Sequence, residues 1–120
     1  MKQKNKILLI EPDPKLSFEI SIALKNFGYE LTDTVPYIFN AIRSIDTNKP
    51  DVIMIDGVIT SQLADFISSY VKLPLIIISS QFEKEIYKYS DKLRILTIIQ
   101  KPYNINEIKI PVAIAFNKLY

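Results

Sequence analysis

Short runs of apolar residues recur along the chain and predict the strands of a sheet. Four of them are rich in β-branched residues and apolar on both faces: Ile7 to Ile10, Val52 to Ile55, Leu75 to Ile78 and Ile95 to Ile99. Strands of this kind are typical of a parallel sheet that helices cover on both sides. A fifth run, Tyr29 to Val35, alternates apolar and polar residues, which predicts a less buried strand or an edge strand.

Between these runs the apolar residues are spaced as on one face of a helix, which predicts five helices. Their apolar positions are Leu16, Ile20, Ala23, Leu24 and Phe27; Ile38, Ala41, Ile42 and Ile45; Leu63, Phe66, Ile67 and Tyr70; Ile86 and Tyr87 within 82–90; and Ile108, Val112, Ala115, Phe116 and Leu119. Gly28 follows the first group and suits a left-handed helix cap. Pro111 falls inside the last group, so that helix either begins near it or kinks there.

Strands that alternate with helices in this way predict an α/β fold of three layers, a (βα)5 sandwich around a doubly wound five-stranded parallel sheet. No flexible linker, low-complexity tract or repeat interrupts the sequence, so we expect one domain over residues 1–120. Sites in such sheets lie beyond the carboxyl ends of the strands. The residues that follow each apolar run are therefore the candidates for function.

Composition removes most of the common catalytic chemistry. The 120 residues include no cysteine and no histidine, which excludes disulfides, thiolate metal sites and histidine bases. Fifteen basic and 13 acidic residues give a net charge of +2, too small to indicate a nucleic-acid or membrane surface. Apolar stretches such as Leu75 to Ile78 are far too short to span a membrane. We therefore expect a cytoplasmic protein that binds neither nucleic acid nor membrane.

Acids, a hydroxyl and a lysine follow the predicted strands. Glu11 and Asp13 come after the first strand, Asp56 after the third, Ser79 after the fourth and Lys101 after the fifth. Carboxylates can hold a divalent cation, and a further carboxylate can act as a nucleophile. A hydroxyl and a lysine can neutralise the oxygens of a transferred phosphoryl group. Together these side chains suit phosphoryl transfer at one edge of the sheet.

The order and spacing of these pieces resemble the receiver domain of two-component response regulators over essentially the whole chain. The pieces that carry the resemblance are Lys6-Ile-Leu-Leu-Ile-Glu-Pro-Asp-Pro14, Asn26-Phe-Gly-Tyr-Glu30, Lys49-Pro-Asp-Val-Ile-Met-Ile-Asp56, Leu73-Pro-Leu-Ile-Ile-Ile-Ser-Ser80 and Gln100-Lys-Pro-Tyr103. Each piece alone is weak, but their order along the chain is specific. The resemblance implies a flavodoxin-like fold, a role in a phosphorelay and no enzymatic activity beyond self-phosphorylation from a phosphodonor.

The resemblance also implies a role for each residue at the strand ends. Asp56 corresponds to the aspartate that a histidine kinase or phosphotransfer protein phosphorylates. Glu11 corresponds to one acid of a Mg²⁺ pocket, to which Asp56 and the backbone carbonyl of Val58 also contribute. Ser79 corresponds to the switch hydroxyl and Lys101 to the phosphate-binding lysine, followed by a cis peptide bond to Pro102.

Several positions depart from the family pattern. Pro12 stands where the family has the second acid of the first turn, the direct magnesium ligand, so we expect weak Mg²⁺ binding unless Asp13 reaches the site. The stretch from Asp56 to Ser79 looks shortened, and Ile98 replaces the aromatic switch residue. These departures favour phosphorylation that is impaired or lost.

Other interpretations stay open. Asp13 between two prolines can simply cap the helix that follows, and Asp56 can be a structural partner of Lys101. A pseudo-receiver could serve as a constitutive docking or dimerisation module through its fourth helix, fifth strand and fifth helix, with Tyr87 and Tyr103 near that face. A flavodoxin-like cofactor-binding protein is less well supported, because the acidic turn after the first strand would repel a phosphate.

Overall fold

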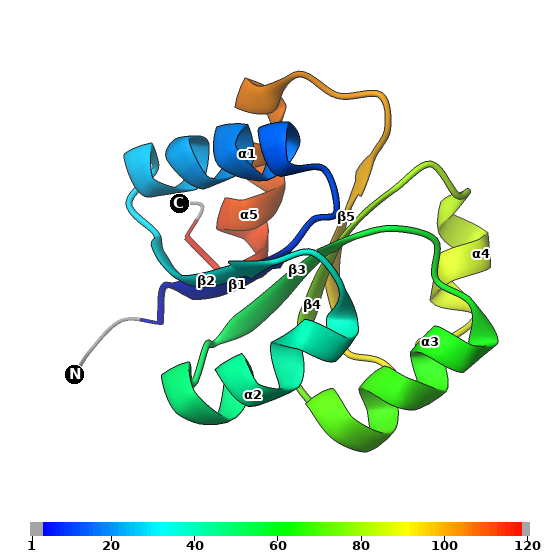
Figure 1. Ribbon diagram of the computed structural model, residues 1–120. Helices are drawn as coiled ribbons and strands as arrows, with labels where there is room; N and C mark the ends of the chain where they lie inside the picture. The colour runs from blue at the N-terminus through cyan, green and yellow to red at the C-terminus, as the bar shows by residue number, and fades with distance from the viewer. Residues whose placement is uncertain (1–3, 119–120) are drawn as a thin grey trace.

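The computed structural model describes residues 4–118, which form a parallel sheet between two layers of helices (Figure 1). The strands are β1 Lys6–Ile10, β2 Glu30–Val35, β3 Val52–Asp56, β4 Leu75–Ser79 and β5 Ile95–Gln100. All neighbours are parallel, in the order β2-β1-β3-β4-β5. The predicted (βα)5 flavodoxin-like fold is confirmed, and β2 lies at an edge as its alternating pattern predicted.

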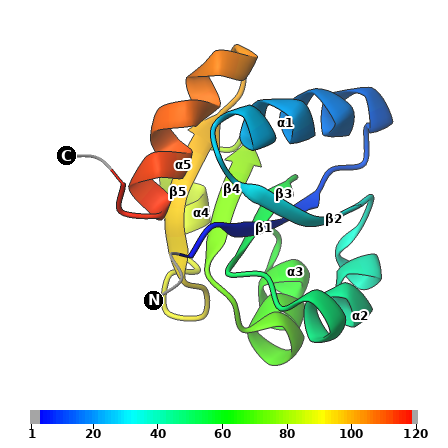
Figure 2. The same cartoon turned by 90° about the vertical axis from the view of Figure 1, so that its left-hand side faces the viewer.

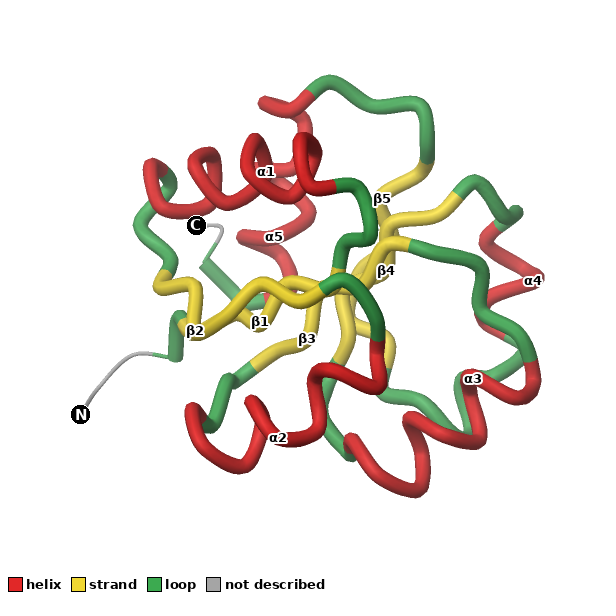
Figure 3. Tube along the Cα trace, in the orientation of Figure 1, coloured by secondary structure: helices red, strands yellow, loops and turns green. Residues whose placement is uncertain are grey.

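Helices and strands alternate along the chain, as the secondary-structure colours of Figure 3 show. The helices are α1 Pro14–Asn26, α2 Ile38–Asn48, α3 Ser61–Phe66 with a π-helical extension η1 Ile67–Val71, α4 Glu83–Tyr87, a 3₁₀ turn η2 Ile105–Ile108, and α5 Lys109–Ala115. Helices α1 and α5 cover one face of the sheet and α2 and α3 the other (Figure 2). No helix within residues 4–118 is long and apolar enough to cross a membrane.

Two hydrophobic cores lie on the two faces of the sheet. Successive residues of a strand point to opposite faces, so Leu8 and Ile53 belong to the core beneath α2 and α3, whereas Leu9 and Met54 belong to the core beneath α1 and α5. Every residue of β3 and β4 is buried. Each fully buried aliphatic side chain contributes about 1.5–3 kcal/mol, so these central strands hold the site residues on a rigid base.

Side-chain and backbone caps define the ends of α1. Asp13 Oδ1 accepts hydrogen bonds from the amides of Lys15 (2.9 Å) and Leu16 (3.4 Å), so Asp13 is the N-cap. At the other end the Gly28 amide donates to the Lys25 carbonyl and the Tyr29 amide to the Leu24 carbonyl, each at 3.0 Å. This is a Schellman motif, and Gly28 has φ +100°, as the predicted left-handed cap requires.

The last two helices differ in length from the expectation. Helix α5 begins at Lys109 after the 3₁₀ turn, so Pro111 is its third residue, where the missing N–H costs no helical hydrogen bond. Of the two alternatives for Pro111, a helix that begins near it is confirmed. Leu119, assigned to the apolar face of this helix, lies outside the described residues. Helix α4 ends at Tyr87 rather than near residue 90, because the chain turns there and buries Leu93.

The third helix widens into a π-turn that the sequence pattern did not predict. The Lys72 amide donates to the Ile67 carbonyl five residues earlier at 3.1 Å. The wider turn buries Ile67 and Val71 and leaves Tyr70 68% exposed, so the assignment of Tyr70 to the buried face was wrong. The rings of Phe39, Phe66 and Tyr70 instead form a row across α2 and α3, with centroids 4.9 and 5.0 Å apart.

We predict that Gly28→Ala lowers the free energy of unfolding by about 1–2 kcal/mol, measured by urea denaturation. A Cβ at this position would meet no atom within 4 Å, so the cost comes from the left-handed backbone alone. Asn26→Ala, at the end of the same helix, is the matched control and should change stability by less than about 0.5 kcal/mol. Equal stability of the two variants would contradict the prediction.

Candidate functional site

The carboxyl ends of β1, β3, β4 and β5 bring Glu11, Asp56, Ser79 and Lys101 to one edge of the sheet. Backbone hydrogen bonds continue the strand ladders to the site, from the Glu11 amide to the Val35 carbonyl and from the Lys101 amide to the Ser79 carbonyl, both 2.9 Å. Glu11, Asp56 and Ser79 are only 5%, 8% and 1% exposed. The sheet therefore presents two buried acids and a buried hydroxyl next to one lysine.

Asp56 and Lys101 form the ion pair at the centre of the site. Lys101 Nζ lies 2.6 Å from Asp56 Oδ1, and the Lys101 side chain is partly exposed whereas that of Asp56 is buried. The peptide bond from Lys101 to Pro102 is cis, as the resemblance implied. The contact gives a buried carboxylate the cation that it requires. It also confirms the expected proximity of these two residues.

Glu11 is a buried acid whose pKa lies well above its usual range. Burial raises its pKa from 4.5 to about 8, and hydrogen bonding to Asp56 acts in the same direction. The Asp13 amide donates to Glu11 Oε2 at 3.2 Å and opposes the shift. A protonated Glu11 can donate to the Asp56 carboxylate, so the two acids share a proton rather than two negative charges.

The two acids also offer carboxylate oxygens that a cation could bind. Within residues 4–118, Glu11 Oε1 and Asp56 Oδ2 are buried and have no hydrogen-bond donor when both acids are ionised. Oxygen atoms of this kind fit Mg²⁺, which retains several waters when few carboxylates bind it. The described part of the chain nevertheless contains no group of three or more potential metal-ligating side chains. The residues therefore fit a weakly held Mg²⁺.

Asp13 does not join this group. Its Oδ1 atom is committed to the amides at the start of α1, which is the capping role weighed from the sequence. The geometry gives no support to Asp13 as a replacement for the acid missing at Pro12, because a turn that begins a helix directs this side chain to the helix amides. Val58 lies in the loop after Asp56, and the role of its carbonyl as a metal ligand stays a prediction.

Ser79 is held by a residue that the sequence analysis missed. Its hydroxyl donates to Gln81 Oε1 and accepts from the Gln81 amide, both at 3.2 Å. The same Gln81 side chain pairs with both backbone groups of Ile59, at 2.7 Å for the Ile59 amide and 3.2 Å for its carbonyl. A glutamine two residues beyond a strand carries no sequence signal for this contact, because its partner is 22 residues away.

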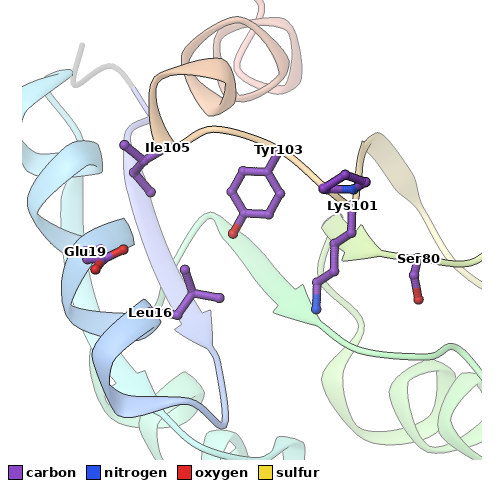
Figure 4. A pocket seen from close by; sticks show the side chains of 7 residues that line it. Leu16, Glu19, Ser80, Lys101, Tyr103 and Ile105 are labelled. Atoms are coloured by element: carbon purple, nitrogen blue, oxygen red, sulfur yellow. The ribbon is translucent and has the colours of Figure 1, made fainter.

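Beside Lys101 an open cavity of about 490 Å³ lies between α1 and the segment that follows β5 (Figure 4). The labelled residues that line it are Leu16, Glu19, Ser80, Lys101, Tyr103 and Ile105. The Tyr103 hydroxyl is buried and has no hydrogen-bond partner among residues 4–118. Burial, and then the negative charges of Asp56 and Glu11, raise its pKa to about 12. Tyr103 therefore remains a neutral phenol beside the acidic pair.

The residues considered for signal output differ in their burial. Tyr103 is partly buried: it packs against the core beneath α1 and α5 and its hydroxyl is buried, and its role at a partner face stays a prediction. Tyr87, on α4, is 42% exposed and available to a partner. Ile98 of β5 packs against the core beneath α2 and α3, so no aromatic ring occupies that position.

Comparison with known proteins shows similarity of structure alone. No family model matches the sequence, and no curated protein matches it. A response regulator from Thermotoga maritima superposes with a TM-score of 0.78 at 14% identity, over 95% of this chain and 98% of that one. The non-phosphorylated HemR receiver domain from Leptospira biflexa gives 0.74 at 20% identity, over 98% of both chains.

The chain has the receiver-domain fold. The signal receiver domain of a modulated diguanylate cyclase from Desulfovibrio desulfuricans gives a TM-score of 0.72 at 19% identity, over 96% of this chain and 95% of that one. At these identities the receiver fold is established, whereas the roles of Glu11, Asp56, Ser79 and Lys101 within it stay predictions.

We predict that the stability of the protein falls as pH rises from about 4.5 to 8 because of Glu11. In this range the native state keeps the Glu11 proton that the unfolded state has lost, so the free energy of unfolding falls by up to about 1.4 kcal/mol per pH unit. The measurement is urea unfolding at a series of pH values without divalent cations. Glu11→Gln, which cannot ionise, should remove this dependence, and an unchanged pH profile in that variant would contradict the prediction.

Proposed function

We propose that this chain is a receiver-type signalling module in which Asp56 is the phosphoacceptor position and phosphorylation is impaired. The observation that carries the proposal is the ion pair of 2.6 Å between Lys101 and a buried Asp56 at the carboxyl edge of a receiver-type sheet. A structural cap for β3 would need neither the buried Glu11 beside it nor the lysine of the neighbouring turn. The donor would be a phosphohistidine of a histidine kinase or phosphotransfer protein.

In the proposed reaction an oxygen of the Asp56 carboxylate attacks the phosphorus of the donor. The bond from phosphorus to the donor nitrogen breaks, the proton needed by the leaving imidazole comes from solvent or the donor protein, and an acyl phosphate forms on Asp56. Lys101 would turn its ammonium from the carboxylate to the oxygens of the transferred group. Glu11 and Asp56 would hold Mg²⁺, which supplies positive charge against the repulsion between the phosphoryl group and the acids.

Two features argue for impaired phosphorylation, and a third argues for impaired output. Burial raises the pKa of Glu11 to about 8, and a cation binds only the deprotonated carboxylate, so cation binding is weakened. The acid that would strengthen the site is absent at Pro12, and Asp13 is committed to the cap of α1. Ile98 further removes the aromatic side chain on which the family's output depends, so a phosphorylated state would have little effect at a distance.

A constitutive docking or dimerisation module is the second candidate function. Large apolar side chains are exposed on the elements that flank β5, on the α4 side Phe82 (75%) and Tyr87 (42%) and on α5 Ile110 (60%) and Ile114 (51%). Such side chains support a contact surface that does not require phosphorylation. Both candidates keep the receiver fold and differ in whether Asp56 controls the contact.

We predict that beryllofluoride, a phosphoryl mimic, changes amide shifts only close to Asp56. The experiment is ¹H–¹⁵N NMR at millimolar Mg²⁺ with and without the mimic, because a ligand shifts an equilibrium only by its differential affinity for two states. Large shifts that reach Ile98 and α5 would show a working phosphorylation switch and contradict impairment. Asp56→Asn is the control, and it should abolish the response without unfolding the protein.

We predict that Pro12→Asp tightens Mg²⁺ binding, measured by isothermal titration calorimetry. The substitution adds a carboxylate to a site with two, and a direct ligand should matter at least as much as the outer partners of metal ligands, whose loss typically costs about 10- to 100-fold in affinity. Pro14→Asp, one position into the helix, is the matched control. Equal affinities of the Pro12→Asp variant and the original protein would show that the site already has its full set of acids.

A further inference from the structure

The loop between β3 and α3 depends on a side chain for its backbone hydrogen bonds. Ile59 in this loop is 2% exposed, and a buried amide and carbonyl need partners. Ile59 lies three residues beyond the end of β3 at Asp56, so it is outside the hydrogen-bond ladder of that strand. Gln81 takes the place of a strand: its Oε1 accepts from the Ile59 amide and its Nε2 donates to the Ile59 carbonyl. A carboxamide is suited to this, since it carries one acceptor and one donor side by side.

The same carboxamide oxygen also receives the Ser79 hydroxyl. A carboxamide oxygen has two lone pairs, and here one accepts from the Ile59 amide and the other from Ser79 Oγ at 3.2 Å. The Gln81 amide donates to the same hydroxyl. Within residues 4–118, both hydrogen bonds of the Ser79 side chain therefore involve Gln81, and none involves Asp56 or Lys101.

A third strand end is tied to this residue. Gln100, the last residue of β5, donates from Nε2 to the Gln81 carbonyl at 2.7 Å. Gln81 thus joins the loop after β3, the loop after β4 and the end of β5 through five hydrogen bonds. The position of Ser79 is coupled to all three segments.

We propose that Gln81 is a positioning residue that withholds the Ser79 hydroxyl from the acceptor site. A phosphoryl oxygen on Asp56 can recruit Ser79 only if the hydroxyl gives up its hydrogen bond to Gln81 Oε1. This rests on the proposed function for the phosphoryl group. The hydrogen bonds that join Gln81 to Ser79 and Ile59, called the latch below, are present in the free protein. It gives impaired signalling a cause that is separate from Pro12 and Ile98.

The test compares the original protein with Gln81→Met, which keeps the length of the side chain and removes its hydrogen bonds. Without any mimic, we expect the Ser79 χ1 rotamer to become averaged in NMR coupling measurements and the Ile59 amide to exchange with solvent at least about tenfold faster. An unchanged rotamer and unchanged exchange would overturn the proposal. This readout does not depend on phosphorylation.

Two matched variants separate the latch from general loosening. Gln81→Glu keeps the acceptor oxygen, so Ser79 should stay in one rotamer in this variant. If residue 81 acted only by filling space, Gln81→Glu and Gln81→Met would have the same effect on Ser79. Gln100→Met removes a hydrogen bond from the Gln81 carbonyl but leaves the Gln81 side chain in place, so Ser79 should remain fixed. An averaged Ser79 rotamer in both of these variants would overturn the assignment to the Gln81 carboxamide.

Beryllofluoride binding in Mg²⁺ then connects the latch to Asp56. Release of one neutral hydrogen bond should tighten binding to Gln81→Met by about two- to tenfold relative to the original protein. Equal binding to both proteins would overturn the withholding role and leave the proposed function intact. If neither protein binds the mimic, the acceptor function of Asp56 fails, and the rotamer and exchange measurements still decide whether the latch exists.

Discussion

The burial of the Asp56 carboxylate is the constraint on which the rest of the site depends. Removing a charge from water costs several kcal/mol unless a partner and hydrogen bonds compensate for it. Lys101 supplies the partner at 2.6 Å, and this is possible only because β5 lies beside β4, which lies beside β3, with all three parallel. The second acid, Glu11, lies under the same constraint, and burial raises its pKa. The order of the strands therefore determines which charged side chains meet at the site.

Much of the fold follows from local pattern. The runs that are apolar on both faces became the buried strands, the alternating run became the edge strand β2, and Gly28 took the left-handed conformation that ends α1. These features depend on neighbours in sequence and on which face is buried, both of which a single sequence records. The helix boundaries around α4 and the π-turn at Ile67–Val71 were not predicted, since they depend on how each helix end meets the core.

The candidate site was only partly predictable for a related reason. Residue types at strand ends brought Glu11, Asp56, Ser79 and Lys101 together, because parallel strands end at one edge. The protonation of Glu11 depends on burial, which no spacing reveals. The contacts of Gln81 depend on the path of a loop 22 residues earlier. The packing of Tyr103 depends on the core and the cavity beside α1, neither of which its place in the sequence reveals.

The row of aromatic rings on the outer side of α2 and α3 has a mechanical consequence. Phe66 contacts Phe39 of α2 on one side and Tyr70 of the π-turn on the other. The two helices are thus joined at the surface as well as through the core. A movement of α3 relative to α2 would therefore have to break the ring contact between Phe66 and Phe39.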